Sequence, residues 1–387
     1  MRSHERARAL WRAPILIWDV LVRGRYDFIY DQMPMRASCM SWVKRRNLFQ
    51  SGANLLYRRL HPWSMPLHMQ IELTNYCNLR CPVCPTGSRS VNRLPRAMEV
   101  RLFERLLDEV GPYLLTTSLW AWGEPLLHPR LREILRAARK YDVVTLLSTN
   151  GQPLARDGII EALADEPPHY LIVAIDGLQN ETNSIYRVGG TIEPILEGVR
   201  RLAAVKRERG LDRPVLNMRY IVMKHNHHEV PRLDEFARRN GFELLTIRNM
   251  FTIESTTTPE VRERMAPDTD VWAGCGHEFG GNAPRGSFIC QEPFWFPTVF
   301  ADGTVVLCEQ DYNAELALGR ISENVSFVDL WYSERAAQLR KTIRDGMQKV
   351  SFCRKCPYLD RPITDFNVEA RSVTQDRRPD HADGGGV

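Results

Sequence analysis

The chain has 387 residues, a length that suits one large domain with a smaller one attached to it. Hydrophobic residues make up 43% of it and charged residues 26%, values that exclude a disordered chain and a membrane-embedded one. The net charge of +5 is small against 52 basic and 47 acidic side chains, and much of the excess lies at Arg2, Arg6, Arg8 and Arg12. We therefore expect no nucleic acid as a partner.

The apolar runs and the cysteines both bear on the compartment. Residues 13–22 form the best apolar run, but Pro14 and Asp19 interrupt it, so the sequence predicts neither a secretory signal nor a transmembrane segment. Nine cysteines in such a chain indicate a reducing compartment, in which thiols bind metals or react rather than form disulfides. We expect a cytoplasmic protein.

Residues 1–65 are predicted to form a helical N-terminal extension, because apolar residues such as Leu10, Trp18 and Leu21 recur there at mixed helical spacing. Two interpretations of this extension stay open. In one, the helix packs against the main domain. In the other, it makes peripheral contact with an acidic membrane surface, as basic amphipathic helices do.

Strands and helices are predicted to alternate through residues 66–250 as six βα units. The expected strands are 69–73, 115–120, 143–147, 170–175, 215–222 and 242–247, and the expected helices are 100–110, 129–140, 158–165, 192–207 and 230–240. Such alternation builds a parallel sheet with helices outside it, either doubly wound or a full or partial βα barrel. In each topology, ligands bind at the carboxyl ends of the strands.

The periodicity is lost in residues 251–286, which are predicted to be a linker or lid. Beyond them, Asp302-Gly303 between two short apolar runs predicts a hairpin, and a helix is expected from 327 to about 345. We interpret residues 287–360 as a small cysteine-rich domain. The polar tail, residues 371–387, is predicted to be disordered.

Three cysteines, Cys77, Cys81 and Cys84, follow the first predicted strand directly. Three thiolates can hold three irons of a four-iron cluster, and the fourth iron is then left open for a chelating cofactor. Zinc is the competing interpretation, but a structural zinc site needs four ligands, and neither a His nor a fourth Cys lies nearby in the sequence. The sequence therefore favours a cluster here.

A second cysteine group comprises Cys290, Cys308, Cys353 and Cys356, with 17, 44 and 2 residues between successive members. Four thiolates satisfy either a fully ligated iron–sulfur cluster or a tetrahedral zinc ion. From the residues alone, both interpretations stay open.

The order of these features resembles the radical SAM superfamily, whose core bears a CxxxCxxC loop after the first strand of a partial βα barrel. After the second predicted strand, Trp122-Gly123-Glu124-Pro125 is similar to the family's GGEP-like motif, with Trp122 in place of the first glycine. The resemblance implies that Gly123 lets the backbone approach S-adenosylmethionine closely and that Glu124 binds the amino group of its methionine part.

Two further segments at predicted strand ends fit the same family. Residues 148–151 (Ser-Thr-Asn-Gly) match its STNG segment, and residues 174–177 (Ala-Ile-Asp-Gly) resemble its SIDG segment. The resemblance implies that Ser148, Asn150 and Asp176 contact the ribose and the carboxylate of the cofactor. It covers about residues 68–250. Four other residues stay open between cofactor contact and local structure: Tyr186, Arg187, Asn217 and Arg219.

Residues 287–360 resemble the shortened SPASM domain called Twitch, in which four cysteines hold one auxiliary four-iron cluster. The hairpin between Cys290 and Cys308, the helix after it and the final CxxC all fit that domain. The implied fold is α/β, a partial (β/α)6 TIM-like barrel with a small C-terminal cysteine-rich Twitch/SPASM domain. The implied cofactors are two [4Fe-4S] clusters and S-adenosylmethionine.

The resemblance implies an enzyme that cleaves S-adenosylmethionine reductively to a 5'-deoxyadenosyl radical and abstracts hydrogen from a substrate. Oxidation or modification of a small polar metabolite or sugar is the leading hypothesis, and peptide or protein modification of the RiPP or sulfatase-maturase type is the alternative. A reducing partner such as flavodoxin or ferredoxin is expected. A zinc- or cluster-bearing scaffold without catalysis is disfavoured by cofactor residues at successive strand ends. No catalytic side chain is assigned, nor any role for Cys39, Cys275 and His277.

Overall fold

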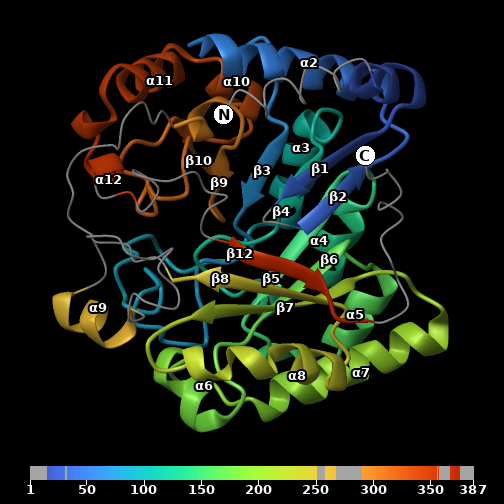
Figure 1. Cartoon of the computed structure of the whole chain (residues 1–387). Helices are drawn as coiled ribbons and strands as arrows, with labels where there is room; N and C mark the ends of the chain where they lie inside the picture. Colours follow the sequence, from blue (N-terminus) through green and yellow to red (C-terminus); the bar gives the residue numbers. More distant parts are fainter. Residues whose placement is uncertain are drawn as a thin grey trace, which may run out of the picture.

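The centre of the fold is a ten-stranded sheet with a core of six consecutive parallel strands (Figure 1). The computed structural model describes residues 15–30, 33–250, 258–266, 290–354, 356 and 367–374. The parallel strands are β3 (His68–Ile71), β4 (Thr116–Ser118), β5 (Val144–Thr149), β6 (Tyr170–Ala174), β7 (Val215–Val222) and β8 (Leu244–Asn249). They pair in chain order, which confirms the parallel α/β core predicted from the sequence.

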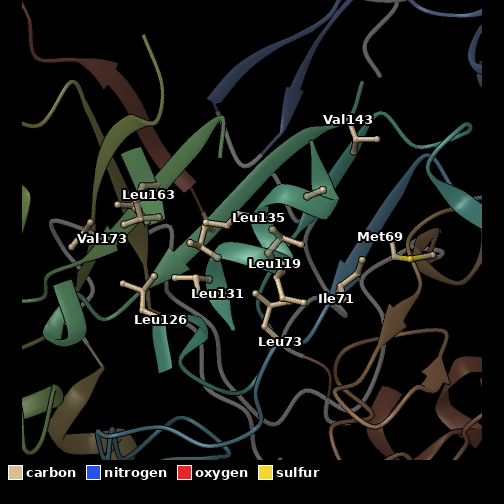
Figure 2. Packing of buried hydrophobic residues seen from close by; sticks show 14 of the residues in the cluster. Met69, Ile71, Leu73, Leu119, Leu126, Leu131, Leu135, Val143, Leu163 and Val173 are labelled. Carbon is tan, nitrogen blue, oxygen red and sulfur yellow. The ribbon is translucent and has the colours of Figure 1, made fainter. Parts of the chain in front are cut away.

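Helices connect these strands and cover one face of the sheet. Right-handed crossovers between strands that pair in chain order place all their helices on the same face. The apolar core lies between the two layers, where Val173 of the sheet packs with Leu131, Leu135 and Leu163 of the helices (Figure 2). The helices are α3 (Val100–Val110), α4 (Leu131–Ala138), α5 (Ile159–Asp165), α6 (Asn180–Tyr186), α7 (Glu193–Arg209) and α8 (Leu233–Arg239).

A hairpin from the N-terminal extension, β1 (Tyr26–Tyr30) and β2 (Met33–Ala37), packs on the other face of the sheet. Met33 and Met35 are buried there against Val144 of β5 and Ile172 of β6. Ile172 and Val173 point to opposite faces, as the two-residue period of a strand requires. The hairpin corrects the expectation of a purely helical extension: side chains in β2 alternate strictly between buried and exposed, as in a strand packed on a sheet.

The hairpin is expected to stabilise the fold measurably. Met35→Ala should lower the free energy of unfolding by about 2–5 kcal/mol, because it leaves a cavity between the hairpin and the sheet. Ile29→Ala is the matched control: Ile29 is 70% exposed on the same hairpin, and its loss should cost less than about 0.5 kcal/mol. Urea denaturation followed by circular dichroism measures both. Two equally small changes would show that the hairpin contributes no stability.

The rest of the extension includes η1 (Asp19–Arg23) and α2 (Trp42–Tyr57). Side chains of α2 bind backbone carbonyls in loops that enter the strands: Lys44 donates to Asp142, and Asn47 donates to Met65 over 3.2 Å and to Tyr113 over 3.3 Å. The helix therefore lies across the amino ends of β3, β4 and β5. Among the described residues, no helix has both the length and the apolar character needed to cross a bilayer.

The C-terminal cysteine-bearing region extends the sheet beyond β3. Its elements are η6 (Glu292–Phe294), β9 (Thr298–Val299), β10 (Thr304–Val306), β11 (Gly319–Arg320), α10 (Phe327–Trp331), α11 (Glu334–Gly346), η7 (Met347–Lys349) and α12 (Ser351–Arg354). Strand β9 pairs parallel with β3, and β9 and β10 form the predicted hairpin. The single helix expected over 327–345 is two helices, because extended Ser333 caps α11 by accepting the Ala336 N–H over 3.1 Å.

The opposite edge of the sheet ends in β12 (Asn367–Ser372), which pairs antiparallel with β8. The prediction of disorder over 371–387 is wrong for residues 371–374, because Arg371 forms an ion pair with Asp234 and Val373 is buried. Composition alone does not reveal these distant partners. Residues 375–387 lie outside the described residues, as does most of the predicted linker 251–286, in which α9 (Pro259–Met265) is described.

Candidate functional site

A cavity opens at the carboxyl ends of the parallel strands, where the topology places ligands. It encloses about 1130 Å³, open solvent at its mouth included. The hairpin occupies the inner face of the sheet nearer the amino ends, so the cavity begins at inward side chains such as Trp120 and Ser148. The wall brings together seven residues that the sequence singled out: Cys77, Cys81, Cys84, Gly123, Glu124, Ser148 and Asn150.

The three thiols lie in a loop between β3 and α3 that is packed against Leu79, Val83 and other apolar side chains. Burial in these surroundings raises the pKa of Cys77 to about 11 and that of Cys81 to about 12. Two donors face the Cys77 sulfur: the Leu79 N–H at 3.4 Å and Asn150 Nδ2 at 3.5 Å. Thiols that resist ionisation in isolation become thiolates when they bind metal, so this donor set fits an iron–sulfur cluster.

Gly123 and Glu124 form the loop after β4. A Cβ atom on Gly123 would collide with the backbone carbonyl of Thr74, so only glycine allows this close packing against the cysteine-bearing segment. The buried Glu124 carboxylate accepts hydrogen bonds from Thr149 Oγ1 at 2.6 Å, from the Asn150 N–H at 2.8 Å and from the Leu126 N–H at 3.0 Å. Burial raises the pKa of Glu124 to about 7, against the effect of these donors.

Asp176 and Arg187 form a buried ion pair beside the cavity. Arg187 Nε lies 2.5 Å from Asp176 Oδ2, and the other carboxylate oxygen accepts the Ile221 N–H at 2.8 Å. Arg187 is on the cavity wall, and its Nη1 lies 3.9 Å from the Cys81 sulfur, whereas Asp176 is absent from the described lining. The structure therefore gives Asp176 an indirect place in the site, as the residue that positions Arg187.

Two more arginines reach the same cavity from neighbouring strands. From the sequence, Arg219 of β7 could be either a cofactor contact or part of the local structure, and the structure places it on the cavity wall. Arg248 of β8 was not predicted as a site residue, because the predicted strand ended one residue earlier. Burial lowers the pKa of Arg219, and the nearby positive charge of Arg248 lowers it further. The inner wall thus offers two cationic groups opposite the thiol loop.

The second cysteine group also comes together. Cys290, Cys353 and Cys356 pack around one small apolar cluster that includes Ile343 and Met347. Cys308 lies within electrostatic reach of the other three, and burial raises the pKa of this thiol well above its ordinary value. The four thiols therefore converge although 66 positions separate the first from the last.

The spacing of the thiols bears on the choice between zinc and a cluster. Within the described ranges, no three His, Cys, Asp or Glu side chains are close enough together to hold a single metal ion. A tetrahedral zinc ion with Zn–S bonds of ~2.3 Å requires sulfur atoms ~3.8 Å apart. A four-iron cluster holds its four thiolates farther apart, because each of them binds a different iron.

Trp122 joins the two cysteine-bearing regions. Its indole Nε1 donates to the backbone carbonyl of Glu309 over 2.9 Å, next to Cys308, and its ring stands edge-on to Tyr312 with the centroids 6.0 Å apart. The same indole lines the cavity. The residue that departs from the family's usual glycine is thus the one that links the cavity wall to the C-terminal region.

Two family matches coincide with these two regions. Residues 71–237 match the radical SAM superfamily, and residues 290–357 match SPASM, an iron–sulfur cluster-binding domain. The chain therefore contains a radical SAM domain and, toward its C-terminal side, a SPASM domain. S-adenosylmethionine and iron–sulfur clusters are the cofactors that this pair of domains implies.

Curated relatives and a solved structure are similar to this chain. The chain is 26% identical over 200 residues to the tungsten-containing aldehyde ferredoxin oxidoreductase cofactor-modifying protein of Pyrococcus furiosus, covering 50% of this chain and 53% of that protein. It is 26% identical over 188 residues to the PqqA peptide cyclase of Rhodopseudomonas palustris, covering 49% and 48%. The chain spans about half the length of the curated relatives it matches.

The crystal structure of Streptococcus suis SuiB bound to its precursor peptide SuiA is similar to this chain, with a TM-score of 0.56 and 16% identity. The superposition covers 81% of this chain and 75% of SuiB. At that identity, the likeness establishes a shared fold.

Proposed function

We propose that the chain is a radical SAM enzyme with two [4Fe-4S] clusters. Cys77, Cys81 and Cys84 would hold the first cluster and leave one iron open. When bound, this cluster and S-adenosylmethionine supply a 5'-deoxyadenosyl radical that abstracts a hydrogen atom from the substrate. The observation that carries the proposal is the single cavity wall shared by the three thiols and four of the five predicted cofactor residues. The second cluster would be held by Cys290, Cys308, Cys353 and Cys356.

The protein's own groups have clear tasks toward S-adenosylmethionine. A carboxylate offers about four acceptor positions, and three on Glu124 are used within the chain, which leaves one for the ammonium group of the cofactor. The same three bonds fix the loop that Gly123 brings close to the thiols. Arg187, held by Asp176, places a positive charge beside the thiol loop that suits the cofactor's carboxylate. Ser148 and Asn150 offer polar groups on the same wall.

Oxidation or modification of a small polar metabolite or sugar remains the leading proposal for the reaction. Arg219 and Arg248 support it, because two guanidinium groups on the cavity wall suit a substrate with a carboxylate or phosphate. A second cluster with four thiolate ligands has no iron open for substrate, so we propose that it accepts the electron that an oxidation releases. A flavodoxin or ferredoxin would supply electrons to the first cluster.

Peptide modification is the second candidate. The similarity to the PqqA peptide cyclase of Rhodopseudomonas palustris favours it, since that relative matches across nearly half of this chain. To distinguish the two candidates, the reduced protein is incubated with peptides encoded by neighbouring genes, and separately with anionic metabolites on which the enzymes encoded there act. The substrate is the compound that raises the release of 5'-deoxyadenosine above the level measured without substrate.

Glu124→Ala tests the cofactor site. We expect the iron content to persist while the affinity for S-adenosylmethionine falls at least about tenfold, because a charge-assisted hydrogen bond contributes about 1.5–3 kcal/mol. Titration of the cofactor against the visible spectrum of the cluster measures this affinity. Glu133→Ala is the control, since Glu133 is a half-buried residue of α4 that pairs with Arg130 and lies outside the described cavity lining. Unchanged affinity in Glu124→Ala would contradict the role assigned to Glu124. Failure of the reduced wild type to release 5'-deoxyadenosine would instead favour a scaffold without catalysis.

A further inference from the structure

The helix α2 has its polar side chains on the inside. Lys44, Asn47, Ser51 and Asn54 recur at helical spacing and are all buried. Three of them bind backbone or hydroxyl groups of the protein: Asn54 Nδ2, for example, donates to Ser64 Oγ at 2.6 Å. A helix on the surface of a globular protein in water ordinarily shows the opposite pattern, with its apolar stripe toward the core.

The outward face of α2 is accordingly apolar and aromatic. Leu56 is 81% exposed, Tyr57 72% and Trp42 68%, and Val43 and Phe49 are exposed as well. Single exposed apolar residues are ordinary, but a run of them along one helix marks an interaction surface. The four buried polar residues occupy the inward face of this helix, and these five apolar side chains lie toward solvent.

The segment just before the hairpin adds to this surface. Among the apolar residues of the segment 15–23, only Val20 is buried, whereas Ile15, Trp18 and Val22 are exposed. Arg45 of α2 donates to the carbonyl of Leu21, and Leu48 of α2 packs with Val20 in one cluster, so the segment and α2 lie side by side. We name residues 15–23 and the outward face of α2 the N-terminal apolar face.

Charge distinguishes the kinds of partner that this face suits. Residues 1–63 contain twelve Lys and Arg but four Asp and Glu, whereas the remaining residues contain 40 and 43. Exposed Arg46 lies on α2 itself, and the Arg45 guanidinium stacks on the Trp42 ring with 4.9 Å to its centroid. Aromatic side chains among basic ones are typical of helices that lie in the interface of a membrane with anionic lipids.

We propose that the N-terminal apolar face docks the protein peripherally on a membrane surface that contains anionic lipids. Trp18, Trp42 and Tyr57 enter the interfacial region, and the basic residues remain at the level of the headgroups. Because α2 crosses the amino ends of the strands, the cavity at their carboxyl ends points away from the bilayer. Docking therefore leaves the cavity open to substrates from water. This inference does not depend on the proposed reaction.

Vesicle flotation with the full-length protein tests the proposal. The wild type should float with phosphatidylcholine vesicles that contain phosphatidylglycerol, bind pure phosphatidylcholine less, and lose binding as salt is raised. Trp42→Ser with Leu56→Ser should weaken the partitioning at least about tenfold, because two large apolar side chains no longer enter the bilayer. Arg46→Glu should weaken binding to the anionic vesicles alone.

Leu94→Ser is the matched control, because Leu94 is 75% exposed outside this face, and it should float like the wild type. Iron content and circular dichroism confirm that each variant is folded. Absence of wild-type flotation with either vesicle would overturn the proposal. So would a stable dimer in light scattering that Trp42→Ser with Leu56→Ser dissociates, since the face would then belong to a second copy of the chain.

Discussion

Replacing Cys77, Cys81 and Cys84 together by alanine is expected to remove about half of the iron and all cleavage of S-adenosylmethionine. Two four-iron clusters give about eight irons per chain after anaerobic reconstitution, and the variant would keep only the cluster of the C-terminal region. The loss of cleavage should be complete, because the described lining of the cavity offers no other thiol to hold the cluster. Iron and sulfide analysis, with chromatography of 5'-deoxyadenosine, measures both effects.

The control for this experiment is Cys39→Ala, since Cys39 is exposed and lies outside both cysteine groups. It should retain the wild-type iron content and the wild-type rate of cleavage. A triple variant with its full iron content would show that these three thiols do not hold the first cluster. Tightly bound zinc in place of iron would contradict the same assignment.

Replacing Cys353 and Cys356 together by alanine is expected to abolish product formation while cleavage of S-adenosylmethionine survives. Cleavage needs only the first cluster, whereas the substrate radical must still lose one electron to become a closed-shell oxidised product. With deuterated substrate, label should enter 5'-deoxyadenosine in the variant and in the wild type alike. Mass spectrometry of 5'-deoxyadenosine and of the product separates the two steps.

The outcomes of this second experiment are distinct. Normal product yield in the double variant would refute the electron-transfer role and leave the C-terminal region a structural part of the cavity wall. Failure to transfer the label would indicate that this region positions the substrate. Cys353 is buried in an apolar cluster, so its replacement also changes the packing of this region. Cys290→Ser therefore serves as a second variant, with the same expected phenotype.

Much of the parallel core could be predicted from the sequence because its signals are local. The bounds of α3 and β7 agree with the prediction residue for residue, since each has a clear apolar period and ends at a glycine or a polar turn. The cysteine loop, Gly123 and Glu124 could likewise be placed at strand ends, because each directly follows a predicted strand. The resemblance to a family then supplied their order.

The rest depends on contacts between residues far apart in the sequence. Nothing local to Met33 and Met35 indicates that they pack on Val144 and Ile172, more than a hundred positions away, so the hairpin was missed. The motif around Asp176 likewise does not show which side chain faces the cavity. That role falls to Arg187, which directly follows α6. The inward helix face of α2 was hidden because its buried residues are polar.

The pairing of β3 with β9 constrains electron transfer between the sites of the two cysteine groups. Gln70 and Ile71, just before the first group, share a hydrogen-bonded ladder with Thr298 and Val299, which lie between members of the second. An electron that passes between the two sites therefore crosses a separation fixed by backbone geometry. Its rate would follow the difference in reduction potential between the centres, and substitutions that alter hydrogen bonds to either set of sulfur atoms should tune it more than changes in interdomain loops.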